Sequence, residues 1–197
     1  MHLLHDRPLK RPKHTFHPLG VFMKSVDVKT VTRAALIASL YATLTLMLGD
    51  LSFGPVQFRI SEAMTVLPYA MPSSIPGLFI GCLIANILGG YGILDVVFGS
   101  AATLIAAVLT AKCRHRWLAP APPVVLNALI IGTMLYFLYY RATPEIPFWL
   151  PIAQVAGGQF VVCYGFGLPL LSLVERHANR AGAVQTGEDK TDWGLHR

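Results

Sequence analysis

Long apolar stretches dominate the chain between residues 30 and 174, and proline and glycine interrupt them at intervals. The hydrophobic pattern predicts six helical segments, at about residues 30–49, 60–72, 76–90, 93–111, 120–140 and 148–174. Turn-forming residues such as Gly54-Pro55 and Gly89-Gly90 separate them. Because about 20 apolar residues cross a bilayer, the pattern predicts an all-α polytopic membrane protein with about six transmembrane helices.

Two of the predicted segments, 60–72 and 76–90, are short for a complete crossing. They are consistent with two helices that tilt or that thin the bilayer. They are also consistent with one re-entrant hairpin that is buried in protein. Both alternatives give the later helices the same orientation, and we favour two separate helices.

Composition agrees with a bilayer environment, since hydrophobic residues make up 54% of the chain and charged residues only 13%. Soluble proteins contain about 25% charged residues. From Val66 to Ala111 the only charged residue is Asp95, and from Trp117 to Tyr140 there is none. A water-soluble fold needs no such runs, so the sequence argues against one.

Three regions follow from this pattern. A transmembrane domain covers residues 30–175, and a polar C-terminal tail covers residues 176–197. Residues 1–29 are rich in proline, histidine and basic residues and have no apolar core of a signal peptide, which predicts a disordered cytoplasmic extension. We expect Met23 as an alternative start, because the chain leads smoothly from it into the first apolar segment.

Basic residues are distributed unevenly between the two sides of the predicted topology. With a cytoplasmic N-terminus, the outer side receives only Arg59 and Arg141. The inner side receives Lys24, Lys29, Arg33, Lys112, Arg114, Arg116, Arg176 and Arg180. Because cytoplasmic loops are enriched in Lys and Arg, the net charge of +6 indicates orientation rather than nucleic-acid binding. We predict a multi-pass plasma-membrane protein with both termini in the cytoplasm.

Polar and ionisable residues gather near the predicted outer surface of the apolar segments. Such residues are costly near hydrocarbon and usually face a cavity or a polar partner. Their grouping therefore predicts a pocket that is open to the outside. The candidate substrate-binding residues are Glu62, Arg59, Gln57, Asn86, Asp95, Gln154 and Gln159. Asn127 is an exception, because it lies near the inner end of the fifth segment.

Each candidate also has a structural interpretation. Arg59 and Glu62 are three residues apart and would form a local ion pair at a helix start. Asp95 would be a helix N-terminal charge that the helix dipole favours. The side-chain amides would be hydrogen-bonding groups between helices. The grouping on one side of the membrane is a stronger indication than any single residue.

A row of small residues, Ala34, Ala38 and Ala42, follows the first segment at a spacing of four. Such a row forms a surface that another helix can approach closely. It is consistent with packing inside the chain and equally with docking of a separate membrane subunit.

Motifs of catalysis and of metal binding are absent from the sequence. There is no G-x-x-x-x-G-K loop and no H-E-x-x-H, and Cys82, Cys113 and Cys163 lack metal-site spacing. We therefore predict that the chain is not an enzyme and has no cofactor or metal. A channel would more naturally place polar residues along the whole path, whereas here the inner half is nearly all apolar.

Three separated motifs resemble the QueT family. The first covers residues 52–63, SFGPVQFRISEA. The second runs from Ile75 through Asn86 and the glycine pair 89–90 to Ser100, and the third covers residues 118–128. The resemblance extends over about residues 30–174, and the motifs agree in order and spacing. The first 22 residues depart from the pattern.

QueT-like proteins are regarded as substrate-specific subunits of energy-coupling factor transporters. The resemblance implies a fold of six membrane helices and a substrate among the deazaguanine precursors of queuosine. It also implies a transmembrane coupling subunit and two ATPase subunits as partners, with the alanine-spaced first helix docking the coupling subunit. Because relatives with different substrates share this fold, another vitamin or small metabolite is the alternative ligand.

The chemistry of a guanine-like base fits the candidate residues. Its edge offers two adjacent N–H donors, and Glu62 is our first choice for the carboxylate that accepts them. A ring carbonyl oxygen needs a donor from Gln57, Asn86 or Arg59. An aminomethyl form of the base would place an ammonium group against Asp95 or Glu145.

Overall fold

The computed structural model describes residues 28–54, 57–143 and 145–177. All the regular elements within these ranges are helical, and no strand occurs among them, which confirms the predicted all-α class. Most of the expected N-terminal extension and C-terminal tail, including Met23, lies outside the described residues.

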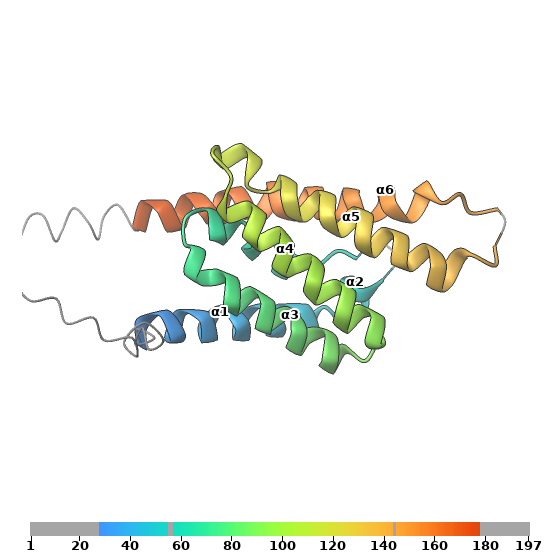
Figure 1. The fold of residues 1–197 in the computed structure, drawn as a ribbon, viewed down its shortest axis with the longest axis horizontal. Helices are drawn as coiled ribbons and strands as arrows, with labels where there is room; N and C mark the ends of the chain where they lie inside the picture. Colours follow the sequence, from blue (N-terminus) through green and yellow to red (C-terminus); the bar gives the residue numbers. More distant parts are fainter. Residues whose placement is uncertain (1–27, 55–56, 144, 178–197) are drawn as a thin grey trace, which may run out of the picture.

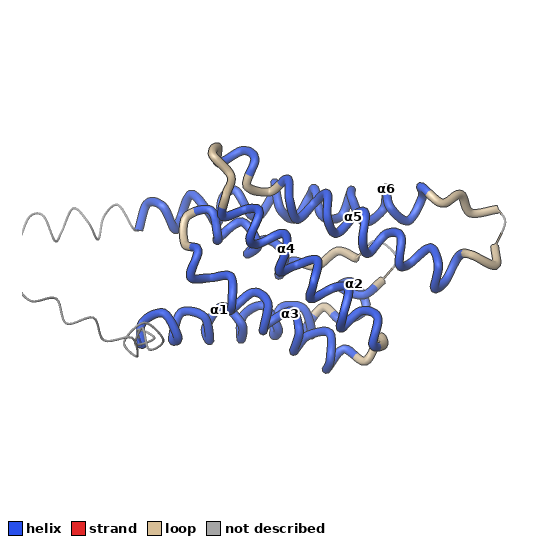
Figure 2. The backbone as a smooth tube through the Cα atoms, in the orientation of Figure 1, coloured by secondary structure: helices blue, strands red, loops and turns tan. Residues whose placement is uncertain are grey.

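Helices run back and forth along an elongated bundle (Figure 1, Figure 2). Segments labelled η are 3₁₀ helices or π-helical turns that extend or connect the α-helices. In chain order the elements are α1 (Val28–Met47), α2 (Gly49–Phe53), η1 (Ile60–Tyr69), η2 (Pro72–Ser74), α3 (Ile75–Gly89), η3 (Asp95–Gly99), α4 (Ser100–Ala111), η4 (Arg116–Leu118), α5 (Ala121–Leu135), η5 (Tyr136–Tyr140), α6 (Trp149–Phe160) and η6 (Val161–Gly167).

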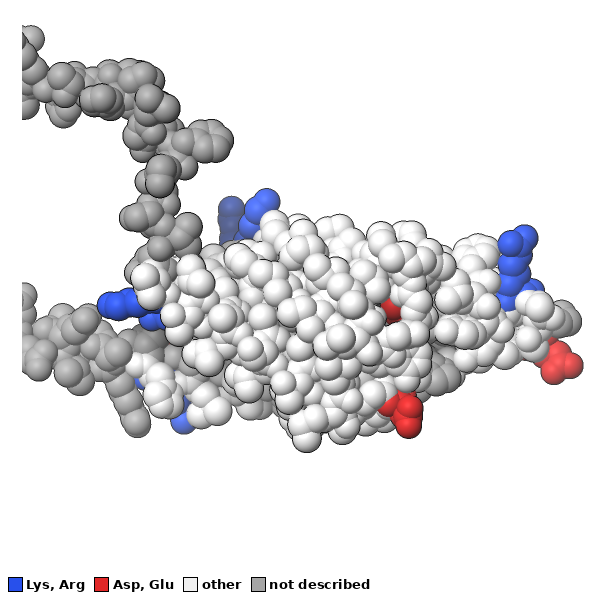
Figure 3. Space-filling view, turned by 90° about the horizontal axis from the view of Figure 1, so that it is seen from below, with Lys and Arg blue, Asp and Glu red and all other residues white. Residues whose placement is uncertain are grey.

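Four helical runs are long and apolar enough to cross a bilayer, and a shorter apolar helix covers Asp95–Ala111. The four runs are Val28–Met47, Pro72–Gly89, Arg116–Tyr140 and Trp149–His177. Large apolar side chains are exposed along these runs, and the visible flank of the bundle carries almost no charge (Figure 3). So large an exposed apolar surface marks contact with lipid, and the chain is a polytopic membrane protein.

The predicted segment 60–72 takes a different form from the other helices. It is the 3₁₀ helix η1, in which every side chain from Ser61 to Pro68 is buried. Because a 3₁₀ helix rises about 2 Å per residue, the 10 residues of η1 cover about 20 Å. Pro68 has no N–H to donate to an α-helical hydrogen bond. The run formed by η2 and α3 is long enough to cross the bilayer, whereas η1 is not one of the four long apolar runs. Two separate helices in place of a re-entrant hairpin therefore stay a prediction.

Val28 and His177, the two described ends of the helical bundle, lie at the same end of the molecule (Figure 1). The loops that follow α3 and precede α6 lie at the opposite end, which we call the far end. This arrangement is the one that an even number of passes requires.

α1 packs closely against α3 through small residues. A Cβ atom added at Gly77 would lie 2.5 Å from the Ala34 carbonyl oxygen, and one added at Gly81 would lie 2.8 Å from that of Ala38. Ala38 and Ala42 are buried. The alanine row therefore packs inside the chain, which was one of its two interpretations. A second row of small residues with the same spacing, Ala35, Ser39 and Thr43, is exposed on α1.

Ala38→Leu is expected to lower the free energy of unfolding by about 1–3 kcal/mol, because the longer side chain overpacks the contact with Gly81. Thermal unfolding in detergent measures the effect. Ser39→Leu is the matched control, since Ser39 lies on the exposed face of the same helix turn. Equal melting temperatures for the two variants would contradict the close approach of α1 and α3.

Candidate functional site

Arg59 and Asp95 face each other in a buried polar cluster near the far end of the bundle. Arg59 directly precedes η1, and Asp95 begins η3. Arg59 Nη2 and Asp95 Oδ1 are 3.8 Å apart, and the two side chains are only 3% and 4% exposed. This distance is too long for a hydrogen bond. Both atoms lack a hydrogen-bond partner among the described residues, although buried charges normally need one.

Neighbouring groups hold the Arg59 guanidinium in place. Its Nε donates a hydrogen bond to the Ser52 carbonyl oxygen at 3.1 Å, and its Cζ lies 4.6 Å from the centroid of the Phe53 ring. Phe53 in turn stacks on Tyr91, with ring centroids 4.3 Å apart. Gly89 makes room for this stack, because a Cβ atom there would lie 2.6 Å from the Phe53 ring. The free Nη2 therefore belongs to a fixed side chain.

Asn86 of α3 connects the cluster to α4. Its Nδ2 donates to the Asp95 carbonyl oxygen at 3.0 Å and to Ser100 Oγ at 3.4 Å. Gly99 permits this approach, since a Cβ atom there would lie 2.8 Å from Asn86 Nδ2. The amide oxygen has no partner within the described ranges. The buried polar atoms left unpartnered around this cluster are Ser52 Oγ, Arg59 Nη2, Asn86 Oδ1 and Asp95 Oδ1.

Gln57 enters the cluster from the loop between α2 and η1. Its side chain is buried and lies close to the Asp95 carboxyl group. Its φ of +49° is the only positive value among the described non-glycine residues. Such a backbone costs roughly 1–3 kcal/mol and is concentrated at functional sites. The loop is therefore held in a strained form that turns Gln57 inward.

Glu62 lies deeper in the same cluster, where its side chain is buried. Tyr41 Oη donates to Glu62 Oε1, and Asn127 Nδ2 lies 3.4 Å from Oε2. Glu62 therefore does not form the local ion pair with Arg59, whose ion pair among the described residues is with Asp95. Asn127 was expected to lie apart from the candidate residues, near the inner end of its helix. Its contact with Glu62 instead places it in the cluster.

The two glutamines of the last segment differ in position. Gln159 is buried, and its Oε1 accepts a weak hydrogen bond from Cys163 Sγ at 3.5 Å. Cys163 Sγ also contacts the Glu62 carbonyl oxygen at 3.6 Å, so Gln159 adjoins η1. Gln154 is half-buried, and its side chain makes no hydrogen bond within the described part of the chain. The structure thus brings Gln159 close to Glu62 and leaves Gln154 outside the cluster.

Two cavities of about 400 Å³ each flank the cluster. Both fall within the roughly 300–1,000 Å³ range of small-molecule pockets. The aromatic cavity is lined by Phe53, Gly54, Tyr91, Leu135, Tyr139 and Tyr140. The second cavity is lined by Asn86, Ile87, Gly90, Gly92, Ile93 and Val96. Flat aromatic rings beside charged and amide groups suit a planar, polar ligand.

Several residues of the cluster were not among the sequence candidates. Tyr41 donates a hydrogen bond to Glu62, Thr103 lies close to the same carboxyl group, and Ser52 accepts a hydrogen bond from Arg59 through its carbonyl oxygen. Tyr41 lies on the buried face of α1 together with Ala38. This position was the indication in the sequence that Tyr41 faces the interior. No group of three or more His, Cys, Asp or Glu side chains is arranged to hold a metal ion within the described ranges.

The family model described as QueT transporter matches residues 31–176. The chain belongs to the QueT transporter family. Because this is a family of transporters, the protein is not an enzyme. The matched range contains every residue of the polar cluster of this QueT family member.

One curated relative is the queuosine precursor transporter QueT of Lactococcus lactis subsp. cremoris (strain MG1363). It is 36% identical over 84 residues, which cover 42% of this chain and 47% of the relative. The match thus spans about half the length of each protein. No solved structure matches the chain.

Proposed function

We propose that this QueT family member is the substrate-binding subunit of an energy-coupling factor importer and captures a deazaguanine precursor of queuosine from outside the cell. The Lactococcus relative is a queuosine precursor transporter, which supports this ligand class. A transmembrane coupling subunit and two ATPase subunits would complete the transporter. ATP hydrolysis falls to those partners, because this sequence carries no G-x-x-x-x-G-K loop.

The unpartnered polar atoms of the buried cluster carry the proposal. A buried unsatisfied polar group costs about 1–3 kcal/mol, so several of them side by side favour a polar ligand. Arg59 Nη2 is a donor, and Asp95 Oδ1 and Asn86 Oδ1 are acceptors. The edge of a guanine-like base presents donors and an acceptor next to one another, and it would satisfy groups of both kinds.

The aromatic cavity and the charges of the cluster support the same ligand class. Phe53 already stacks on Tyr91 and has Arg59 over its ring, so a planar base would stack on the other rings that line this cavity, Tyr91, Tyr139 and Tyr140. The cluster contains the two carboxyl groups of Glu62 and Asp95 against the single guanidinium of Arg59. This balance suits a base that carries an ammonium substituent. We propose Glu62 as the floor of the site, with Gln57 and Gln159 beside it.

Calorimetric titration of the purified protein tests the proposal. The ligands are an aminomethyl-deazaguanine, guanine and riboflavin, which is the unrelated planar control. We expect the deazaguanine to bind at least tenfold more tightly than guanine, a difference of about 1.4 kcal/mol. Tighter binding of riboflavin would favour a different vitamin as substrate. An absence of binding by all three would overturn the proposal for this ligand class.

We propose that the far end faces the outside of the cell, because the basic residues Lys112, Arg114 and Arg116 lie in the loop at the other end. In a variant with its native cysteines replaced, a membrane-impermeant maleimide should label Glu145→Cys and spare His115→Cys in intact cells. Both positions are exposed. Native Cys113 is a poor reporter, because burial raises the pKa of its thiol. The reverse labelling pattern would mean that the far end, and the site with it, faces the cytoplasm.

The resemblance assigns docking of the coupling subunit to the alanine row of α1. Because Ala38 packs against Gly81 of α3 and Ala42 is also buried, we propose that Ala35, Ser39 and Thr43 provide the exposed surface on the same helix. Ser39→Leu should therefore reduce co-purification with the coupling subunit and leave ligand affinity unchanged. Recovery of the partner at the wild-type yield would contradict this assignment.

A further inference from the structure

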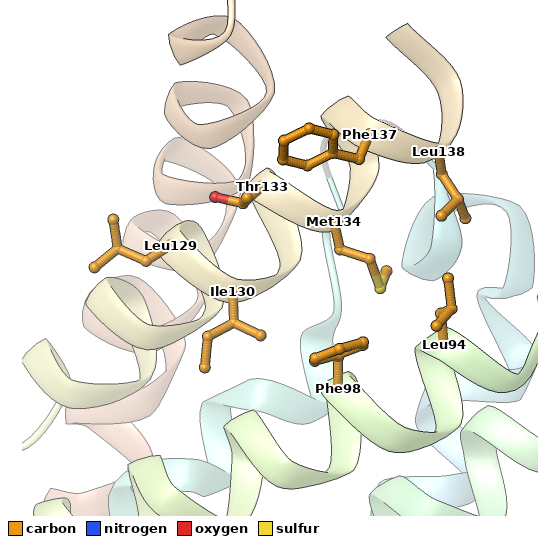
Figure 4. Close-up of a pocket in the computed structure, with 8 residues that line it drawn as sticks. All are labelled: Leu94, Phe98, Leu129, Ile130, Thr133, Met134, Phe137 and Leu138. Atoms are coloured by element: carbon orange, nitrogen blue, oxygen red, sulfur yellow. The ribbon is translucent and has the colours of Figure 1, made fainter. Parts of the chain in front are cut away.

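An apolar groove lies between η3 and the continuous helix of α5 and η5, and none of its lining residues belongs to the polar cluster. Its volume is about 420 Å³. In Figure 4, Met134 and Leu138 point toward Leu94 and Phe98 across the groove. The other lining residues are Leu129, Ile130, Thr133 and Phe137. Only the Thr133 hydroxyl among these side chains is polar, so the groove offers nothing to a guanine-like base.

The groove is long and opens on the lipid-facing surface. Its lining residues extend from Leu129 to Leu138, which corresponds to about 13 Å at 1.5 Å per residue of helix. Phe98, Leu129 and Phe137 on its walls are about half exposed. An apolar groove of this length fits a hydrocarbon chain.

Irregular helix turns border the groove on both sides. Phe98 lies in the π-helical turn η3, and Phe137 and Leu138 lie in η5. A π-helical turn interrupts the regular side-chain ridges by which neighbouring helices interlock. The two helices therefore do not fill the space between them.

Arg141 provides a positive charge at the end of the groove. It directly follows η5, and its Cζ lies 6.0 Å from the centroid of the Phe137 ring, which lines the groove. Its side chain is exposed and forms no ion pair with another described residue. Guanidinium groups bind phosphate in a bidentate geometry, and the phosphates of a bilayer lie at this boundary of the hydrocarbon.

We propose that the groove binds one acyl chain of an anionic phospholipid, whose phosphate pairs with Arg141. The apolar lining holds the chain, and the guanidinium distinguishes a headgroup with net negative charge from a zwitterionic one. The site is independent of the substrate site proposed above. A bound lipid would tie η3, which begins at Asp95, to the end of α5.

Binding of defined lipids to the delipidated protein tests this site by native mass spectrometry. The probes are phosphatidylglycerol and phosphatidylcholine with identical acyl chains. One basic residue near a membrane surface contributes about 1 kcal/mol toward anionic lipid, so phosphatidylglycerol should bind about fivefold more tightly. Arg141→Gln should remove this preference and leave phosphatidylcholine binding unchanged.

Thr133→Phe fills the groove and should weaken binding of both lipids at least fivefold. Val125→Phe is the matched control, because Val125 is exposed on the same helix and does not line the groove. Equal wild-type affinities for the two lipids would overturn the role of Arg141. Unchanged lipid binding by a Thr133→Phe protein with the wild-type melting temperature would overturn the groove as the site.

Discussion

Asp95→Asn is expected to weaken binding of a deazaguanine ligand by at least about thirtyfold. Asp95 Oδ1 is buried without a hydrogen-bond partner in the described structure, and it lies 3.8 Å from Arg59 Nη2. If ligand N–H groups occupy this position, the carboxylate accepts charge-assisted hydrogen bonds worth about 1.5–3 kcal/mol each. Asparagine keeps the shape but loses the charge and one acceptor oxygen. A loss of about 2 kcal/mol corresponds to roughly thirtyfold in the dissociation constant.

Asp50→Asn is the matched control for this measurement. Asp50 is an exposed carboxylate in α2, at the same end of the bundle, so its replacement should leave ligand affinity unchanged. Asp95→Asn also removes the acidic partner of Arg59, and the ligand-free melting temperature is therefore measured alongside the calorimetry. A folded Asp95→Asn protein with the wild-type affinity would exclude Asp95 from the ligand site.

Hydrophobic patterning predicted the helices because a helix that faces lipid must be apolar over the roughly 20 residues that cross the bilayer. The expected segments 30–49 and 76–90 lie within two residues of α1 and α3 at each end. Segment 60–72 departs from the rule because η1 is surrounded by protein rather than by lipid. Its apolar run therefore gave no sign of the 3₁₀ geometry. The π-helical turns η3, η5 and η6 also left no mark in the hydrophobic pattern.

The site was predictable only where position along the chain implied depth in the membrane. Arg59 and Asp95 were expected at the same level, and the structure brings them together. The contacts of Glu62 with Tyr41 and Asn127 join three different helical elements, and such contacts depend on helix rotation. Sequence spacing alone does not determine this rotation. It suggested the nearest charged residue, Arg59, as the partner of Glu62.

The alanine row of α1 also shows that sequence spacing does not determine which helices are in contact. A small residue at every fourth position identifies a face that a helix can approach, but it does not identify the approaching helix. The glycines at positions 77 and 81 have the same spacing on α3, and they complete the contact. Complementary rows on two segments of one chain therefore favour internal packing over docking of a partner.

Glu62→Ala is expected to lower the free energy of unfolding by about 2–6 kcal/mol. The carboxylate is buried, and it accepts hydrogen bonds from Tyr41 Oη and Asn127 Nδ2. Alanine would leave both buried donors unpaired, and each unpaired donor costs about 1–3 kcal/mol. Thermal unfolding in detergent measures the loss. Tyr41→Phe removes only one of the two hydrogen bonds and should cost less.

Glu62→Gln separates the structural role of Glu62 from its proposed role in the ligand site. Glutamine keeps an acceptor for Tyr41, and Asn127 can turn its amide to accept from the new NH₂ group, so the fold should lose less stability than in Glu62→Ala. A carboxylate has about four acceptor positions, so these two hydrogen bonds leave others for a ligand. We therefore expect Glu62→Gln to remain folded and to lose roughly thirtyfold in deazaguanine affinity, or about 2 kcal/mol. If the folded variant instead keeps the wild-type affinity, Glu62 stabilises the bundle beneath Arg59 and Asp95 without contacting the ligand.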